Sequence, residues 1–291
     1  MSYRIREIDA LRGFAVCGIM IVNAWQHSED ATGWVMWDLF QGRFYPIFAF
    51  LFGMSFALMN APPLIMLRRM AVLALFGVVH WSVNPGEVLL PYSMLGAVAL
   101  VPSMWLADAV VAGLGLALTA VSLFNGDPWL LIAGLLPLGM AFVRYGVRLR
   151  QPLVFAVSAA LTIWLTWWWI QDHHVYLVAV LTGAVAYATG FLLLSPRIFE
   201  PLGKMALTCY LSSTAVILTW HGPFWLVSAV TLVAQWIFCR WWLSRYRYGP
   251  LEWVWRCLTW WTLVENRTHD ARSPVPDPRR PRPEGEPGHS P

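Results

Sequence analysis

Ten long apolar segments follow one another along this chain of 291 residues, and they constrain its fold more than any other feature. A helix that crosses the hydrocarbon core of a bilayer needs about 17–25 mainly apolar residues. The segments lie near residues 10–26, 40–60, 67–84, 87–104, 106–124, 128–146, 152–171, 174–195, 204–221 and 223–243. They predict an all-α, polytopic transmembrane helix bundle of about ten spans.

The composition also indicates a membrane setting. Hydrophobic residues make up 58% of the chain and charged residues 12%, whereas a soluble domain carries about 25% charged residues. A soluble body of this size cannot enclose so much apolar surface, so the lipid bilayer is the predicted partner of the bundle. Nothing in the sequence indicates binding to nucleic acid, and nothing predicts an oligomeric state.

The basic residues give an independent test of the topology, because Lys and Arg concentrate in the short cytoplasmic loops of membrane proteins. With ten spans, one side of the bundle collects Arg4, Arg6, Arg12, Arg68, Arg69, Arg144, Arg148, Arg150, Arg197, Lys204, Arg240, Arg245 and Arg247. On the opposite side the only basic residue is Arg43, just inside the second span. We therefore predict a multi-pass protein of the plasma (cytoplasmic) membrane with both termini in the cytoplasm.

The chain after the last span divides into two parts. Residues 249–258 predict a short helix lying on the cytoplasmic surface, with Leu251, Val254, Trp255 and Leu258 on one face and an ion pair of Glu252 with Arg256 on the other. The Pro- and Arg-rich stretch that follows lacks large apolar residues and predicts a disordered cytoplasmic tail. We place the membrane domain at residues 1–264 and the tail at 265–291.

Ionisable groups at membrane depth cost about 2.5–3.5 kcal/mol at mid-span, so each one is a functional candidate. His80 lies about one turn inside the outer end of the third span, and Glu87 follows the turn at 84–86. This hairpin brings the two side chains within reach of each other. A His held by a carboxylate is suited to act as a general base; alternatively, the two groups satisfy each other in a structural hairpin.

Three further candidates lie on the predicted outer side. His27 falls in the first outer loop, either as a base or as a solvated loop residue. Arg43 either clamps an anionic group of a substrate or extends to lipid phosphate, and Asp38 lies near it in the sequence. On the inner side, Asp9 and Arg12 have the spacing of a helix-surface pair that anchors the first span, or else they face a cytoplasmic donor pocket.

Motifs of several enzyme classes are missing from the sequence. It contains no Walker A or dinucleotide glycine fingerprint, no GxSxG, no HExxH and no Cys/His set with metal-ligand spacing. Their absence argues against an ATP-driven pump or a dinucleotide enzyme. We expect neither a bound metal nor a permanently bound cofactor.

Five strings, called the signature strings below, carry a resemblance to a known family. They are IDALRGFA (8–15), RFYPIFAFLFG (43–53), RR (68–69) leading to GVVH (77–80), GKMALTCYL (203–211) and YGPLEWVWR (248–256). In this order they resemble the YeiB-like family of bacterial membrane proteins, a domain of unknown function, over residues 4–261. In that family the turn after the His reads Gly-Asp, and Gly86-Glu87 retains the carboxylate here.

The first strings are also distantly similar to multi-span membrane acyltransferases, namely the acyltransferase-3 group and heparan glucosaminide acetyltransferase. The latter passes an acetyl group from cytoplasmic acetyl-CoA across the membrane with a His in its first outer loop. The resemblance places His27 at that position, before the PIFAFLFG segment at 46–53. The loop length differs, and the His that the acyltransferase-3 group has on its first span is Asn23 here or is missing.

These observations lead to three hypotheses. The first is acyl transfer from an acyl-CoA co-substrate to a hydroxyl or amine of a cell-envelope sugar, a lipid or a secreted small molecule. His80 or His27 would be the base, Glu87 would orient it, and Arg43 with Asp38 would hold the substrate. The second is a carrier of a small anionic metabolite, favoured by Pro breaks inside spans. The third is a membrane scaffold.

Overall fold

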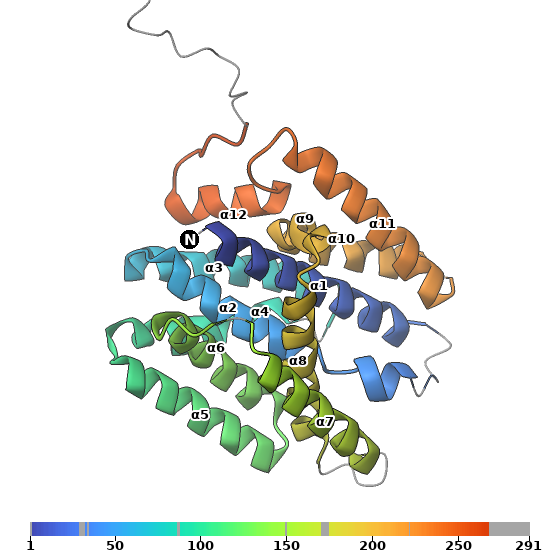
Figure 1. The fold of residues 1–291 in the computed structure, drawn as a ribbon. Coiled ribbons are helices and arrows are strands. Elements are labelled where there is room, and N and C mark those ends of the chain that lie inside the picture. The colour runs from blue at the N-terminus through green and yellow to red at the C-terminus, as the bar shows by residue number, and fades with distance from the viewer. Residues whose placement is uncertain are drawn as a thin grey trace, which may run out of the picture.

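The chain is a bundle of helices in the computed structural model, which describes residues 2–28, 33, 35–85, 88–148, 150–169, 175–220 and 222–267 (Figure 1). Its α-helices are α1 (Ser2–Gln26), α2 (Tyr45–Met59), α3 (Pro63–Trp81), α4 (Leu89–Leu95), α5 (Asp108–Asn125), α6 (Pro128–Arg144), α7 (Pro152–Trp169), α8 (Tyr176–Leu194), α9 (Glu200–Lys204), α10 (Ala206–Thr219), α11 (Phe224–Leu243) and α12 (Pro250–Trp260). The predicted all-α bundle is confirmed.

Each of the ten predicted spans coincides with helical structure, although several are shorter or less regular than expected. In the described residues, six helices have the length and hydropathy of a membrane span: Arg6–Gln26, Met36–Met59, Pro63–Trp81, Asp108–Asn125, Tyr176–Leu194 and Phe224–Leu243. Shorter apolar helices cover Leu89–Trp105, Pro128–Arg144 and Pro152–Trp168. Helices satisfy their own backbone hydrogen bonds in lipid, where water is absent. The chain is a multi-pass membrane protein.

Two of the predicted spans contain breaks. The span predicted at 87–104 begins as α4 and continues as a π-helical turn, η2 (Gly96–Leu100), and a 3₁₀ turn, η3 (Pro102–Trp105). The span predicted at 204–221 is α10, joined to the preceding helical segment Arg197–Lys204 at a bend of 82°. Breaks of this kind are tolerated at membrane depth where the irregular backbone is buried in protein or lines a cavity.

The basic loops lie together at one end of the bundle, called the basic end below. Arg150, between α6 and α7, forms an ion pair with Glu7 of α1 at 2.8 Å and donates a hydrogen bond to Ser195 after α8 at 2.6 Å. Arg144 at the end of α6 pairs with Asp108 at the start of α5 at 3.2 Å. These contacts agree with the predicted alternation of spans. That the basic end faces the cytoplasm remains a prediction.

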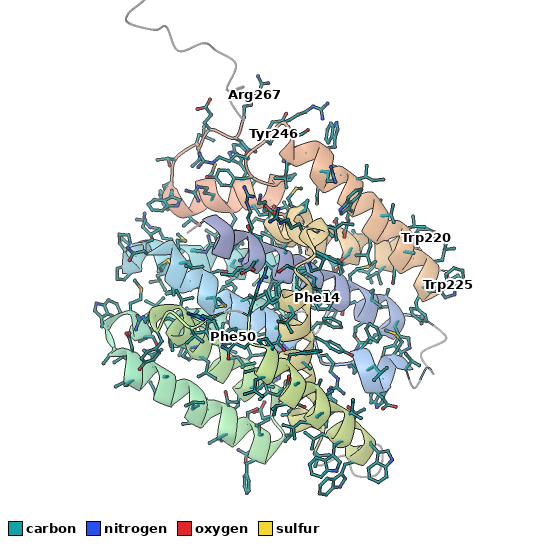
Figure 2. The ribbon with its side chains drawn as sticks, in the orientation of Figure 1. Phe14, Phe50, Trp220, Trp225, Tyr246 and Arg267 are labelled. Atoms are coloured by element: carbon teal, nitrogen blue, oxygen red, sulfur yellow. The ribbon has the colours of Figure 1, made fainter. Side chains whose placement is uncertain are left out.

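At the opposite end, the last turn of α1 contacts the segment that precedes α2. Gln26 donates to Gln41 at 3.2 Å, and the rings of Trp25 and Trp37 meet edge to face. Figure 2 shows Trp220 and Trp225 far from Tyr246, which lies beside Arg267 near α12. The predicted disordered tail falls almost wholly in residues 268–291, outside the described residues.

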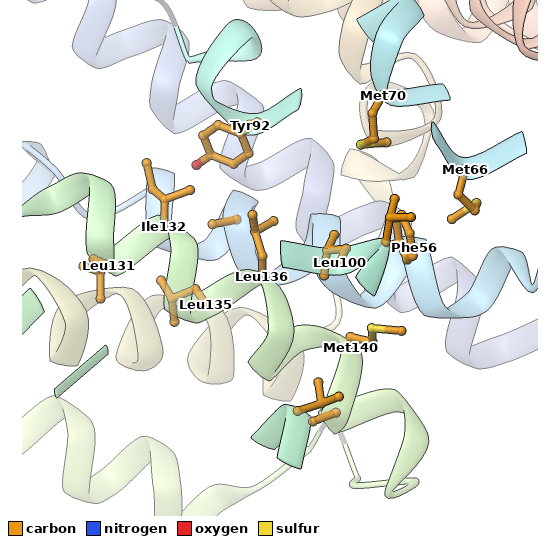
Figure 3. Packing of buried hydrophobic residues seen from close by; sticks show 14 of the residues in the cluster. Phe56, Met66, Met70, Tyr92, Leu100, Leu131, Ile132, Leu135, Leu136 and Met140 are labelled. Atoms are coloured by element: carbon orange, nitrogen blue, oxygen red, sulfur yellow. The ribbon is translucent and has the colours of Figure 1, made fainter. Parts of the chain in front are cut away.

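The largest core cluster lies where α2, α3, α4 and α6 meet (Figure 3). Glycines let α2 and α6 pack with their backbones in contact, since a Cβ at Gly53 would overlap the carbonyl oxygen of Leu136, and one at Gly139 would overlap that of Phe50. Small residues at such crossings drive helix association in lipid through van der Waals packing. This packing fixes α2, whose other face reaches the site described below.

A second close crossing joins α1 to α9. A Cβ at Gly203 would overlap the carbonyl oxygen of Asp9, and one at Gly13 would overlap that of Phe199. The crossing therefore requires glycine on both helices. It places Arg12 and Lys204, the neighbours of these two glycines, on adjoining elements at the basic end.

The last helix, α12, packs against α3 and α10. Leu251 and Trp255 belong to a cluster with residues of these helices, as expected for the apolar face. The predicted ion pair of Glu252 with Arg256 is wrong. The Glu252 carboxylate instead accepts hydrogen bonds from the backbone and hydroxyl of Thr208 on α10, at 3.0 and 2.6 Å.

Candidate functional site

A cavity of about 260 Å³ lies at the basic end, enclosed by α1, α2, α3, α4, α9, α10 and α12. We call it the cationic cavity. Its charged lining residues are Arg12, Arg69, Lys204, Glu252 and Arg256, and its aromatic ones are Phe48, Phe52, Tyr92, Tyr210, Tyr248 and Trp255. Four cations and one carboxylate thus share a chamber whose remaining wall is mostly apolar.

Arg12 is held in place by three helices. Its guanidinium donates to Asp9 Oδ1 at 2.9 Å, to Ser55 Oγ on α2 at 2.6 Å and to the Gly203 carbonyl at 3.4 Å. The predicted pair of Asp9 with Arg12 therefore exists, at the wall of a pocket. The pair anchors α1, and Arg12 of the pair also lines a cavity; that this cavity takes a cytoplasmic donor remains a prediction.

Two other cations are held by aromatic rings. The Arg69 guanidinium lies over the ring of Trp255 at 3.7 Å from its centroid, and that of Arg256 lies over Tyr248 at 4.9 Å. Within the described residues, neither has a carboxylate in ion-pair range, and the Nε of Arg256 is buried without a hydrogen-bond partner. Stacking on rings fixes a guanidinium while leaving N–H groups for a ligand.

Lys204 differs from these two because it already has an acidic partner. It pairs with Glu200 at 2.7 Å, one turn earlier on α9. Arg12, Arg69 and Arg256 line the same cavity, so their like charges oppose one another there. An anion between them would relieve that repulsion and would form charge-assisted hydrogen bonds, which are about twice as strong as neutral ones. The arrangement is suited to bind a phosphate or carboxylate group.

Glu252 supplies a testable pH dependence. Burial raises the pKa of its carboxyl above the ordinary value, and the hydrogen bonds from Thr208 lower it in part. A raised pKa in the folded state stabilises the protein below the ordinary pKa, and this contribution is lost as the pH rises through the raised value. We expect Glu252→Gln, which keeps the amide within reach of Thr208, to unfold at a higher temperature than the natural protein near neutral pH.

The check is a series of thermal unfolding curves of both proteins in nanodiscs at acidic and neutral pH. The advantage of Glu252→Gln should shrink as the pH falls toward the ordinary pKa of Glu. An advantage that is constant with pH, or that grows in acid, would contradict the assignment.

The five signature strings converge on the cationic cavity. They contribute Arg12 from the first, Phe48 and Phe52 from the second, Arg69 from the third, Lys204, Leu207 and Tyr210 from the fourth, and Tyr248, Glu252, Trp255 and Arg256 from the fifth. Strings that lie far apart in the sequence thus form the walls of one chamber. Of the residues at this end, only Asp9 and Arg12 were predicted from the sequence as candidates for a site.

His80 lies beyond the deep wall of the cavity. It is buried in the last turn of α3, and its ring meets that of Tyr210, a cavity-lining residue, at 5.1 Å between centroids. Its predicted partner Glu87 lies outside the described residues. Of the predicted bases, His80 is thus the one that the fold brings toward the cationic cavity.

The remaining predicted residues lie at the opposite end of the bundle. His27 is exposed and its Nδ1 is 2.8 Å from the carbonyl oxygen of Asn23. Arg43 is fully buried and donates to the carbonyls of Asp38 (2.7 Å) and Ala179 and to Thr166 Oγ1 (2.8 Å). Arg43 thus contacts the backbone of Asp38 and ties α7 and α8 to the turn before α2; that the two side chains hold a substrate remains a prediction.

The sequence patterns did not predict site roles for Arg69, Lys204, Arg256 and the stacking rings. In the sequence Arg69 and Lys204 mark only the topology, Arg256 has the spacing of an ion pair with Glu252, and Trp255 falls on the apolar face of a helix. The available signal was the signature strings themselves, each of which contains a cation. Their convergence depends on the helix crossings and is not visible in the order of residues.

Comparisons with known proteins agree with the resemblance. A family profile described as "Protein of unknown function (DUF418)" matches residues 143–262. An uncharacterized 39.9 kDa protein in the amylase 3' region of Bacillus acidopullulyticus is 30% identical, with 89% of this chain and 95% of that protein covered. YxaH of Bacillus subtilis (strain 168) is 22% identical over 91% and 97%. No solved structure matches. The chain belongs to the DUF418 (YeiB-like) family of proteins of unknown function.

Proposed function

We propose that this membrane protein is an acyltransferase whose cationic cavity binds the phosphate-bearing part of an acyl-CoA at the basic end. The acyl group would pass to a hydroxyl or amine of a cell-envelope sugar, a lipid or a secreted small molecule. The observation that supports this most is the pair Arg69 and Arg256, which are fixed on aromatic rings and face the cavity without an acidic partner among the described residues.

The chemistry of CoA matches this lining. Its phosphates are dense anions, and the planar guanidinium binds two phosphate oxygens at once. The apolar and aromatic part of the wall suits the uncharged arm that carries the thioester. At about 260 Å³ the cavity is slightly smaller than the usual range for ligand pockets, so part of a CoA would extend through its opening.

The transfer needs a base at the deep end. The acceptor oxygen or nitrogen attacks the thioester carbonyl carbon, the C–S bond breaks, and the acceptor's proton is taken up by the base and then by the departing thiolate, which leaves as CoA thiol. His80 is the candidate for this base, since its ring lies against Tyr210 of the cavity wall. In this proposal Glu87 orients His80, and Arg43 with Asp38 stabilises the opposite end of the bundle.

Turnover by the purified protein tests the proposal. With acetyl-CoA and cell-envelope acceptors, the natural protein in nanodiscs should release CoA thiol. His80→Gln should lower kcat by about 10²- to 10⁴-fold, the usual contribution of a general base, with little change in the KM for acetyl-CoA. Ser82→Ala, an exposed change two residues further on, is the matched control. A comparable loss in His27→Gln would assign the role of the base to His27 in the loop. The absence of turnover by folded protein would contradict acyl transfer.

One observation favours a second candidate, a carrier of a small anionic metabolite. The bend of 82° between α9 and α10 lies at the cavity, where Lys204 and Ala206 form part of the wall. Carriers bind anionic groups at broken helices of this kind, whose half-helix N-termini carry a partial positive charge. Flux of an anion into vesicles that survives His80→Gln, without CoA turnover, would favour the carrier.

A further inference from the structure

A second cavity, of about 390 Å³, lies on the other face of α2. Phe50 and Met54 of α2 form its floor, α5 and α6 contribute one side, and α7 and α8 contribute the other. We call it the lateral cavity. We propose that it binds one acyl chain of an anionic phospholipid from the leaflet at the basic end. The proposal is independent of the acyl-transfer function.

The position of the cavity follows from how the helices pair. α5 packs along α6 and α7 packs along α8, while α6 packs against α2. The two hairpins are therefore separate units, and the lateral cavity lies between them. An opening between two membrane hairpins faces hydrocarbon chains.

The chemistry of the wall suits a hydrocarbon and little else. Apolar side chains such as Leu138 form nearly all of it. Two of its polar side chains already bond to the protein: the Thr189 hydroxyl donates to the carbonyl of Val185 at 2.6 Å, and the Gln151 amide donates to that of Arg148 at 2.9 Å. A polar ligand would lose its hydration here and gain few hydrogen bonds in return.

The length of the cavity matches one leaflet. On α8 its wall runs from Leu181 to Leu192, a distance of about 16 Å at 1.5 Å per residue. The hydrocarbon core of a bilayer is about 30 Å thick, so this is about half of it. The cavity reaches the basic end at Gln151 and Leu192, so the bound lipid would come from the leaflet on that side of the membrane.

Charge at the mouth selects an anionic headgroup. The side-chain amide of Gln151, a wall residue, donates to the backbone carbonyl of Arg148, and the Arg148 side chain is exposed. The neighbouring Arg150 is engaged by Glu7 and Ser195, so Arg148 is the cation next to the mouth in the chain that has no ion pair among the described residues. A basic residue near the membrane surface attracts anionic lipid. A phosphatidylglycerol chain in the cavity would bring its phosphate to Arg148.

Photo-crosslinking tests the proposal on the full-length protein in nanodiscs. The probe is phosphatidylglycerol with a diazirine in one acyl chain. We expect it to label peptides of α6 and α8, and Ala188→Trp, which fills the cavity, to remove most of that label. Val121→Trp is the matched control, because Val121 is exposed on α5 and does not line the cavity. Labelling of Ala188→Trp equal to that of the natural protein would overturn the proposal.

Arg148→Gln, a change at an exposed position, provides a second test that does not depend on how a tryptophan is accommodated. Competition with unlabelled lipid should show that the natural protein prefers phosphatidylglycerol to phosphatidylcholine, and the variant should lose about fivefold of that preference, as expected for one surface cation. An unchanged preference would refute the headgroup assignment. Labelling spread evenly over all lipid-facing helices would show annular lipid only and would overturn the site.

Discussion

Replacing Arg69 and Arg256 together by glutamine should weaken the binding of CoA by about 100-fold, since each charge-assisted hydrogen bond contributes about 1.5–3 kcal/mol and tenfold in affinity is about 1.4 kcal/mol. Each single change should cost roughly tenfold. These two cations line the cavity and stack on rings without a carboxylate partner among the described residues. Their loss therefore leaves no buried acidic group unpaired, and the fold should persist.

The matched control is Arg68→Gln. Arg68 precedes Arg69 in the sequence and also stacks on a tryptophan, Trp261, but it does not line the cavity. Calorimetric titration of CoA into protein in nanodiscs should give the control nearly the natural affinity. The affinity of the natural protein should also fall with salt, as expected for phosphate contacts. Equal losses in Arg68→Gln and Arg69→Gln would mean that general surface charge, and not the cavity, attracts CoA.

Among the described glycines, Gly203 is the one whose replacement by alanine should destabilise the protein most. A Cβ there would overlap the carbonyl oxygen of Asp9 and approach the backbone nitrogen of Gly13 at 2.8 Å. Both neighbours are backbone atoms, so α1 and α9 must move apart. Overpacking costs about 1–3 kcal/mol where side chains can adjust, and we expect at least the upper part of that range here. Because Arg12 donates to the Gly203 carbonyl, CoA binding should fall as well.

Gly113→Ala makes the same chemical change in open space. Gly113 lies within α5 with no atom within 4 Å of an added Cβ. Alanine in a helix is favoured over glycine by about 0.5–1 kcal/mol, so this variant should be slightly more stable. Thermal unfolding of the three proteins in one detergent gives the comparison. Similar unfolding temperatures for Gly203→Ala and the natural protein would show that the crossing is looser than described.

The helices were predictable from the sequence because each span is a continuous run of apolar residues. The sequence also predicted which loops share an end, and the ion pair of Arg150 with Glu7 brings two of them together. The breaks were not predictable in the same way. The turn at Met205 lies at the start of an apolar run and the π-helical turn at Gly96–Leu100 lies inside one, and hydropathy does not distinguish a bent helix from a straight one.

The site was less predictable than the fold, for a physical reason. A cation at the end of a span has the same sequence signal whether it faces lipid headgroups or a cavity. Arg69 and Arg256 become neighbours only because α12 returns to pack on α3. Conversely, Arg43 is predicted on the side of the membrane that is poor in basic residues. Its guanidinium donates hydrogen bonds to backbone carbonyls of the protein itself. Its predicted role in binding substrate remains a prediction.

The central claim is that the signature strings build one cavity that binds the phosphates of an acyl-CoA. Its most direct test is a cryo-electron microscopy map of the protein in nanodiscs with a non-hydrolysable acyl-CoA analogue. The account predicts phosphate density within hydrogen-bonding distance of Arg69 and Arg256, with the acyl arm directed toward Tyr210. Density for the analogue at another place, with the cationic cavity empty, would contradict it.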